Sequence, residues 1–427
     1  MVVAFVAATF APVAAHAQSV APISMARGAD VSWCTEMETD GRRFYNSRGR
    51  ETELFALLKE LGMTAVRLRV WVNPLRFGYG AWCDKADVVA KARRAQAQGL
   101  DVMIDFHYSD FFADPGTQTL PLDWTGYSLD EVKNAVTAHT KEVLTALKAE
   151  GIMPRWVQAG NETNNGMVWD VGKIDWNKNG SARYTSYVAV SNAAYDAVKA
   201  IVPEAFVIVH YAGAYNAADW DGWFFKEFKA AGGKFDMIGL SHYPDYNDWG
   251  SQAAGVQSNV NAAKSVETLG KLFGVPVMIC ETGFSNYDAS KASRVMLDLM
   301  ERLRVLSQCA GVFYWEPEVD GTWKPSYYDT RGWGAYSMGA FSVDGKPTSA
   351  LDAFKDPTDG IEDVPSSLQS KAAEPSAKFQ VSEGDGRGGR PVSSEAVWYD
   401  LQGHRLSSSI RGAQIMKRGS ETRKFFK

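Results

Sequence analysis

Two glutamates that end strand-like runs are the residues with the clearest chemical potential in this sequence. Residues 156–162 form an aromatic and β-branched run that ends in Gly, Asn and Glu162. The apolar run 275–280 ends in the same way, at Glu281. Two carboxyl groups at strand ends suggest cleavage of a glycosidic bond, in which one protonates the leaving oxygen and the other attacks the sugar or activates water. We interpret the two as a catalytic pair, although either residue alone would fit a salt-bridged loop carboxylate equally well.

A barrel is the fold that would bring these two strand ends together. Strand patterns alternate with helical patterns over about 330 residues, which predicts a (β/α)8 TIM barrel of class α/β. A doubly wound sheet is the competing fold, but it would place its ligand at one switch point rather than at nearly every strand end. The predicted strands are residues 29–33, 64–72, 100–108, 156–162, 205–210, 235–240, 275–281 and 311–317. The predicted helices are residues 51–61, 87–98, 129–150, 184–201, 256–273 and 289–306.

The amino-acid composition limits the classes of binding partner that we expect. The 427 residues are 45% apolar and 22% charged, as in a globular protein, and carry a formal net charge of -5. A negative net charge does not indicate a basic surface that would bind nucleic-acid phosphates, so we expect no nucleic-acid partner. The 14 Trp and 17 Tyr fit a sugar-binding protein, because flat aromatic rings stack on the apolar faces of sugars, although any single Trp belongs more often to the core.

The two ends of the chain differ in composition from its middle. Residues 1–17 are apolar, lack a positive start and end in Ala-His-Ala, which resembles a secretory signal cleaved before Gln18. No other run is apolar and long enough to span a membrane. We therefore expect an exported protein, secreted, periplasmic or at the cell surface. Residues 18–356 would form the catalytic barrel, residues 357–392 a disordered linker, and residues 393–427 a small β-like segment with a sorting role.

Six motifs, in order along the chain, resemble glycoside hydrolase family 53, the endo-β-1,4-galactanases that degrade type I arabinogalactan. The resemblance runs from Gly28 to about Phe354 and rests on residues 28–33, 66–74, 105–110, 160–162, 281–283 and 314–317. It implies a clan A enzyme that acts with retention on β-1,4-galactan, with Glu162 as acid/base and Glu281 as nucleophile. Such roles require surroundings that push the pKa values of the two carboxyl groups apart. We expect a monomer that needs no cofactor.

The resemblance and the strand ends together give a set of substrate-binding candidates. Arg67 or Arg69, which share one face of their strand, would hold Glu281 ionised. Asn161 would bond the sugar 2-hydroxyl and Tyr243 the nucleophile, while Trp315 would form the floor beneath the reacting sugar. The other candidates are His107 and His242, expected to line the cleft without transferring protons, Trp71 and Trp124, as platforms or plain core, and Asp110.

Several alternatives stay open at this stage. Another retaining clan A β-glycanase, such as a mannanase, shares the two-glutamate machinery, and a non-catalytic glycan-binding barrel would be expected to lose one carboxylate. A metal-dependent hydrolase ranks low because the strand-end histidines lack paired spacing. Calcium, which some members carry, is unsupported because residues 285–289 hold one Asp. Residues 333–342 depart from the family pattern, and a Cys34–Cys83 bridge cannot be read from sequence.

Overall fold

The computed structural model describes residues 25–78, 80–244 and 257–355, and the backbone of four short strands further along the chain. The expected signal segment 1–17 and the expected linker 357–392 lie outside the described residues. The four short strands, all within the expected segment 393–427, form one antiparallel sheet. They are β11 (Val397–Tyr399), β12 (Arg405–Leu406), β13 (Ala413–Arg418) and β14 (Glu421–Phe426).

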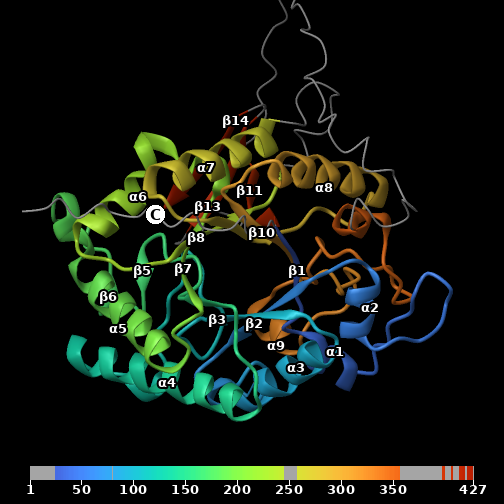
Figure 1. Cartoon of the computed structure of the whole chain (residues 1–427), viewed down its shortest axis with the longest axis horizontal. Coiled ribbons are helices and arrows are strands. Elements are labelled where there is room, and N and C mark those ends of the chain that lie inside the picture. The colour runs from blue at the N-terminus through green and yellow to red at the C-terminus, as the bar shows by residue number, and fades with distance from the viewer. Residues whose placement is uncertain are drawn as a thin grey trace, which may run out of the picture.

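Eight parallel strands close into a barrel in the order β1-β10-β9-β8-β7-β4-β3-β2. Figure 1 shows the helices as a ring around these strands, so the predicted (β/α)8 TIM barrel is confirmed. The barrel strands are β1 (Ala26–Asp30), β2 (Ala65–Val70), β3 (Asp101–Phe106), β4 (Trp156–Ala159), β7 (Phe206–Ala212), β8 (Met237–His242), β9 (Val277–Thr282) and β10 (Cys309–Trp315). The short β5 (Gly166–Met167) and β6 (Gly172–Lys173) form a separate pair within the loop after β4.

Six of the nine helices in the described residues match predicted helices. The nine are α1 (Cys34–Thr39), α2 (Leu54–Glu60), α3 (Lys85–Ala97), α4 (Leu129–Ala149), α5 (Thr185–Ile201), α6 (Asp219–Ala230), α7 (Gln257–Phe273), α8 (Ala289–Arg304) and α9 (Tyr327–Arg331). The long helix α6 was not predicted, because its aromatic residues have modest helix propensity and Gly222 interrupts the pattern. Tertiary packing stabilises it, since Phe224, Phe225 and Phe228 are buried.

Helix α4 illustrates how local sequence sets the outer layer. The Ser128 side chain accepts from the backbone N–H of Glu131, and the Glu131 side chain accepts from the backbone N–H of Ser128, which is a complete capping box. Val132, Val136 and Val143 then recur at helical spacing and are buried. The helix is therefore fixed at its start by its cap and held against the strands by one apolar face.

The first strand lies three residues earlier than expected. Residues 29–33 were predicted as strand, but β1 ends at Asp30. Oδ1 of Asp30 accepts hydrogen bonds from the backbone N–H and the hydroxyl of Ser32, at 3.1 and 2.5 Å, and this side-chain turn stops the strand. Trp33 consequently caps α1 instead of ending a strand.

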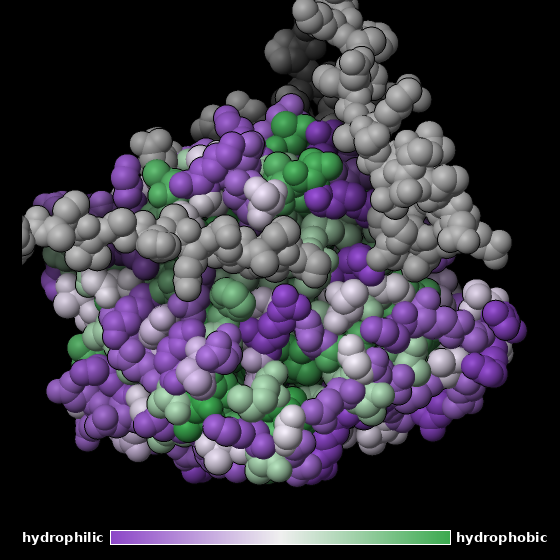
Figure 2. Space-filling view, in the orientation of Figure 1, coloured by the Kyte–Doolittle hydropathy of each residue, from purple (hydrophilic) through white to green (hydrophobic). Residues whose placement is uncertain are grey.

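The barrel interior changes character along its axis. Ten buried side chains, mostly apolar and including Met103, Trp156 and Phe313, fill one part of the interior. Further along the same strands the buried interior residues are charged or polar, as at Arg67, Asp105 and Gln158. Figure 2 shows one end of the molecule with hydrophilic residues around most of its rim and hydrophobic residues nearer the centre. The sheet thus supplies an apolar base on which a polar cluster can be held.

Candidate active site

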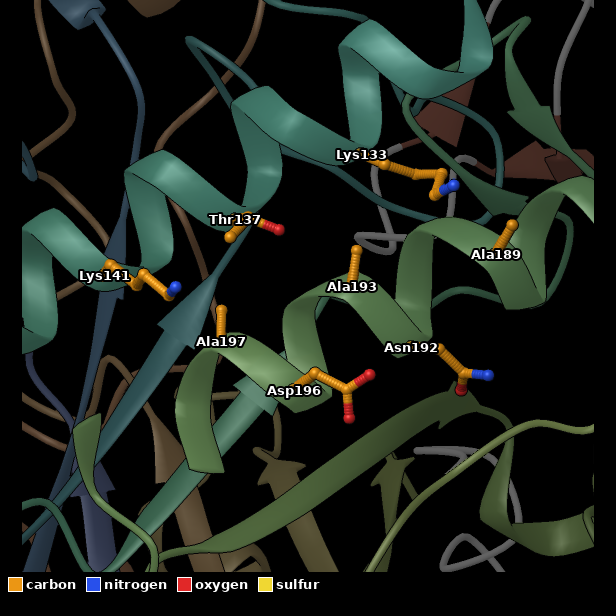
Figure 3. Close-up of a pocket in the computed structure, with 8 residues that line it drawn as sticks. All are labelled: Lys133, Thr137, Lys141, Ala189, Asn192, Ala193, Asp196 and Ala197. Atoms are coloured by element: carbon orange, nitrogen blue, oxygen red, sulfur yellow. The ribbon is translucent and has the colours of Figure 1, made fainter. Parts of the chain in front are cut away.

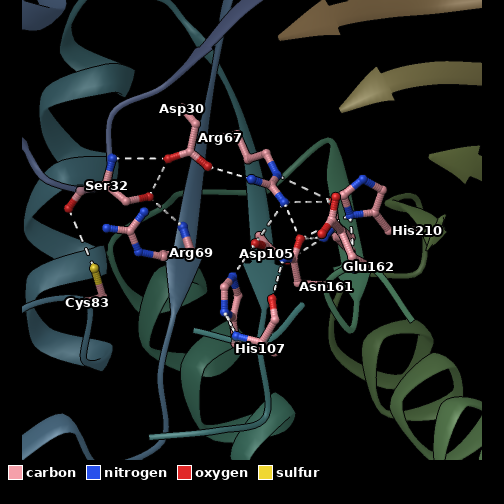
Figure 4. A network of polar contacts seen from close by, with 12 residues as sticks. Asp30, Ser32, Arg67, Arg69, Cys83, Asp105, His107, Asn161, Glu162 and His210 are labelled. Atoms are coloured by element: carbon pink, nitrogen blue, oxygen red, sulfur yellow. Dashed lines mark hydrogen bonds and ion pairs between the residues drawn. The ribbon is translucent and has the colours of Figure 1, made fainter. Parts of the chain in front are cut away.

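Arg67 is the centre of the polar cluster inside the barrel. Its side chain extends from β2 and is fully buried. Nη1 lies 2.6 Å from Oδ2 of Asp30, and Nη2 lies 2.9 Å from both Oδ2 of Asp105 and Oε1 of Glu281. Burial opposes the charge of the guanidinium, but Asp105, Glu281 and Asp30 outweigh it and raise the pKa of Arg67 above its ordinary value. Figure 4 shows Arg67 between Asp30 and Asp105, with Asn161 and His210 close by.

Glu281 occupies the end of β9 and has partners for both carboxylate oxygens. Oε1 pairs with Arg67, and Oε2 accepts a hydrogen bond from the Tyr243 hydroxyl at 3.1 Å. Burial raises the pKa of Glu281 above its ordinary value; Arg67 opposes this shift, and the negative charge of Glu162 adds to it. Two carboxyl groups that influence each other's pKa in this way do not ionise independently. Arg67 and the Tyr243 hydroxyl favour the charged form of Glu281.

Glu162 sits in a tight turn directly after β4. Gly160 has φ of 96°, and a Cβ there would lie 2.7 Å from Cγ2 of Thr163. Glu162 itself has φ of 45°, a left-handed conformation that is uncommon for a residue with a side chain and concentrates at functional sites. The turn is held from two sides, because the N–H of Glu162 donates to Nδ1 of His210 at 3.3 Å and Gln118 Nε2 donates to the Asn161 carbonyl at 2.8 Å.

Asn161 and His210 connect the arginine to this turn. Oδ1 of Asn161 accepts from Nη2 of Arg67 at 2.8 Å and lies 3.0 Å from Nδ1 of His210. His210 extends from β7, and its Nε2 lies 2.9 Å from Oγ of Ser241. Burial, followed by the charge of Arg67, holds the pKa of His210 well below its ordinary value, so the ring is neutral. His210 was not among the predicted site residues, although its position at the end of an apolar run resembles that of the two glutamates.

His107 is fully engaged by protein groups. Its Nε2 lies 2.9 Å from Oδ2 of Asp105, and its Nδ1 accepts from the N–H of Ala113 at 3.0 Å. Burial alone would raise the pKa of Asp105, but Arg67 and His107 hold it below its ordinary value. The imidazole therefore supports the carboxylate that in turn binds Arg67.

Arg69 is separated from Glu281 although it shares a face of β2 with Arg67. It forms a buried ion pair with Glu316, and its guanidinium lies over the rings of Trp33, at 5.1 Å, and Phe112, at 4.7 Å. The alternative in which Arg69 holds the nucleophile is thus wrong. Trp71 is also fully buried here, 5.1 Å from Phe112 in an edge-on contact, and belongs to the core.

His242 is placed differently from the expectation that it lines the cleft. Its Nε2 lies 2.8 Å from Oδ1 of Asn259, a residue of α7, and the side chain is 1% exposed. Side chains alternate along β8, and Ser241, which contacts His210, takes the inward position. His242 therefore faces the helix layer, and burial there lowers its pKa to about 4.

Asp110 and Trp124 organise the loop after β3 rather than contacting the carboxylate pair. The carboxylate of Asp110 accepts from the N–H groups of Asn73 and Leu122, at 2.8 and 2.9 Å. Trp124 is buried within the main apolar cluster. Trp315, by contrast, is half-buried at the end of β10, and its ring makes an edge-on contact with Tyr336, with the two ring centroids 4.6 Å apart. Of Asp110, Trp124 and Trp315, only Trp315 lies in a position that fits direct contact with a sugar.

A groove on the outer helix layer offers no comparable chemistry. It lies between α4 and α5 and is drawn in Figure 3 with Lys133 and Lys141 on one helix and Asp196 on the other. Two of these charges have partners already, since Lys133 pairs with Asp130 and Asp196 with Lys234. The carboxylate pair inside the barrel is therefore the candidate active site.

The described residues lack a metal-binding cluster, a disulfide and a membrane-spanning helix. None of their His, Cys, Asp and Glu side chains form a group of three or more that could hold a metal ion. All four cysteines are buried and free, so Cys34 and Cys83 are not bridged. No helix in this part of the chain is long and apolar enough to cross a membrane.

The sequence and the fold are similar to those of glycosyl hydrolase family 53. The family model described as glycosyl hydrolase family 53 matches residues 26–354. A probable arabinogalactan endo-β-1,4-galactanase A of Aspergillus terreus is 31% identical over 323 residues, covering 68% of this chain and 85% of that protein. An uncharacterized protein in the bgaB 5′ region of Niallia circulans is 30% identical, over 77% and 93% of the two chains. The family 53 catalytic domain of Ignisphaera aggregans has a TM-score of 0.64 at 27% identity, covering 80% of this chain and 99% of that one.

Proposed function

The chain belongs to glycosyl hydrolase family 53 and is a glycoside hydrolase, and we propose that it is an endo-β-1,4-galactanase that cleaves type I arabinogalactan with retention. One observation carries the chemistry of this proposal: Glu281, held by Arg67 and Tyr243, lies within electrostatic reach of Glu162. The substrate rests on relatives such as the endo-β-1,4-galactanase of Bacillus subtilis and the probable galactanase of Aspergillus terreus.

In the first step, the ionised Glu281 attacks the anomeric carbon while Glu162 gives its proton to the leaving oxygen. Arg67 and the Tyr243 hydroxyl stabilise the charge on Glu281 until the covalent bond forms. Retention requires the two carboxyl groups to lie about 5 Å apart, without the wider gap that leaves room for a water.

In the second step, the charge on Glu281 is lost and Glu162 can ionise, so that it activates a water to release the sugar. The turn after β4 must keep the same position in both steps. His210 and Gln118 serve this purpose, since they bind the backbone of Glu162 and Asn161. Trp315, half-buried at the end of β10, forms the floor beneath the reacting sugar.

We also propose that the enzyme acts outside the cytoplasm as a monomer. The apolar segment 1–17 with its Ala-His-Ala end supports export, and a polymer too large to enter the cell is the substrate that such an enzyme would meet. N-terminal sequencing of the mature protein tests this point, with Gln18 expected as the first residue.

The test is reducing-sugar release from linear β-1,4-galactan, with mannan, xylan and cellulose in parallel. Galactan should be cleaved by the wild type and not by Glu281→Ala, and azide should restore bond cleavage in that variant by acting as an external nucleophile. Glu142→Ala, which removes an exposed carboxylate of α4, is the control and should keep wild-type activity. NMR of the first product should show the β anomer. Activity only on another glycan would keep the mechanism and reject the galactan substrate.

A further inference from the structure

A tryptophan outside the catalytic cluster presents a flat face to solvent. Trp176, in the loop between β6 and α5, is 47% exposed. Its ring stacks on Trp223 of α6, with centroids 5.7 Å apart and an angle of 24° between the planes. One face is therefore supported by a second indole while the side chain stays half open to water. We call Trp176 and Trp223 the indole platform.

The backbone around Trp176 is held in one conformation. The N–H of Asn177 donates to Oδ1 of Asp175 at 3.1 Å, and the N–H of Lys178 donates to the Asp175 carbonyl at 3.1 Å. The guanidinium of Arg183 lies 5.5 Å from the centre of the Trp176 ring. A ring fixed in this way loses little conformational entropy when a ligand stacks on it. Lys178 and Asn177 also place polar groups next to the ring, where sugar hydroxyls would need partners.

The indole platform lies on the same end of the barrel as the catalytic pair. Trp223 is in the second turn of α6, and the 3₁₀ turn η3 (Gly180–Tyr184), which leads into α5, packs against α6. In a (β/α)8 barrel the helices start at the end where the strands finish, which is the end that bears Glu162. The loops after β4 and β7 are joined there, because Asn164 exchanges two hydrogen bonds with the backbone of Ala212, at 2.8 and 3.0 Å.

The proposed roles of the two glutamates indicate which part of a bound chain reaches the seam between the loops after β4 and β7. Glu162 protonates the leaving oxygen, so the leaving-group part of the chain extends past the β4 side of the site, whereas Glu281 attacks from the β9 side. The seam between the loops after β4 and β7 also exposes Tyr215, 42% accessible in η4 (Ala214–Asn216). Exposed aromatic side chains thus lie on the side of the site toward which the leaving-group part of the chain extends from Glu162.

We propose that the indole platform is a distal subsite that binds a sugar of the leaving-group part of the galactan chain. The inference rests on the proposed galactanase activity. A galactosyl residue would stack its apolar face on Trp176, while Arg183, whose guanidinium lies 5.5 Å from the centre of the ring, would bind the sugar hydroxyls. Binding at this distance from the bond that breaks makes longer chains better substrates without changing the chemical step.

The test compares Trp176→Ala with Trp176→Phe on galacto-oligosaccharides of increasing length, labelled at the reducing end. For chains long enough to reach the platform, Trp176→Ala should lose roughly tenfold in kcat/KM, and the shortest cleaved chain should be unaffected. Cleavage should move toward the reducing end, so that shorter labelled fragments form. Trp176→Phe should recover most of the loss. Val305→Ala, at the end of α8, removes an exposed apolar side chain elsewhere and is the control.

The outcomes separate this inference from the galactanase proposal. If the wild type cleaves no galactan, the proposed function fails before the variants are compared. If the wild type is active and Trp176→Ala keeps its rate on every chain length, the subsite is rejected alone. A shift of cleavage toward the non-reducing end, which gives longer labelled fragments, would place Trp176 on the other side of the scissile bond and would also overturn the inference. If Trp176→Ala binds the polymer more weakly but cleaves at unchanged positions, Trp176 belongs to a separate surface site and the inference is also rejected.

Discussion

Nη2 of Arg67 lies 2.9 Å from Oε1 of Glu281, although one residue belongs to β2 and the other to β9. The same guanidinium binds Asp30 and Asp105, so one cation serves three buried carboxylates. A buried charge keeps its place only while its partners remain, because removing one leaves the others without compensation. Glu281, the proposed nucleophile, is therefore part of a network that also stabilises the fold.

Arg67→Lys should damage both stability and catalysis. A lysine has no planar fork and cannot bind three carboxylates at once. We expect a loss of about 3–5 kcal/mol in the free energy of unfolding and at least about a hundredfold loss in kcat. Denaturant unfolding and initial rates on galactan measure the two effects. Arg93→Lys, at an exposed pair with Glu150, should change neither. Wild-type kcat in Arg67→Lys would contradict the role given to this residue.

Tyr243→Phe should shift the acid limb of the pH profile to higher pH. The hydroxyl donates to Oε2 of Glu281 at 3.1 Å and so stabilises the ionised form of this carboxylate. Without this donor the pKa of Glu281 rises, and more of the enzyme carries a protonated nucleophile at low pH. The measurement is kcat/KM against pH. Tyr195→Phe removes a hydroxyl that bonds Asp236 instead, and its profile should match the wild type. An unchanged limb in Tyr243→Phe would remove Tyr243 from the mechanism.

Glu36→Gln should make the protein more stable at alkaline pH. Burial, opposed by Arg69, raises the pKa of Glu36 from 4.5 to about 8, and its Oε2 has no hydrogen-bond partner. The folded state binds this proton more tightly than the unfolded chain, so the contribution to stability is complete below about pH 4.5 and is lost as the pH rises to about 8.

The glutamine variant keeps the shape and cannot ionise. At pH 8.5 the variant should have a higher melting temperature than the wild type, and its free energy of unfolding should be larger by on the order of a few kcal/mol. At pH 5 the difference in stability should nearly vanish. Glu142→Gln, on the surface of α4, serves as the reference variant. A difference that is equal at both pH values would show that the proton on Glu36 is not its source.

Variants of His210 and His242 should have different defects, the first in catalysis and the second in stability. His210→Gln disturbs the contacts to Asn161 and to the backbone of Glu162, so kcat should fall about tenfold or more. His242→Gln disturbs the link from β8 to Asn259 of α7 and should lower the melting temperature while kcat and KM stay near wild type. Kinetics and thermal unfolding of both variants check the pair. A raised KM in His242→Gln would restore the original expectation that this ring lines the cleft.

The sequence by itself was sufficient to predict the barrel and to single out Glu162 and Glu281 at the ends of two of its strands. Strand and helix patterns recur at regular spacing, and local signals such as the capping box of α4 confirm where elements begin. Glu162 and Glu281 stand out because each ends an apolar run, and parallel strands of a closed barrel bring such ends to one face. Whether these two residues catalyse the reaction is a prediction that the proposed variants test.

The tertiary structure decided which neighbouring side chains join them. Arg67 and Arg69 share a face of β2, but two residues along a strand is about 6.6 Å, and that step places one beside Glu281 and the other beside Glu316. His210 and His242 are equally indistinct in sequence, because parallel strands are buried on both faces and carry no polar alternation that reveals which face is inward. The register of β8 against β7 turns Ser241 inward and His242 outward, and that register is a property of the closed sheet, not of any single strand.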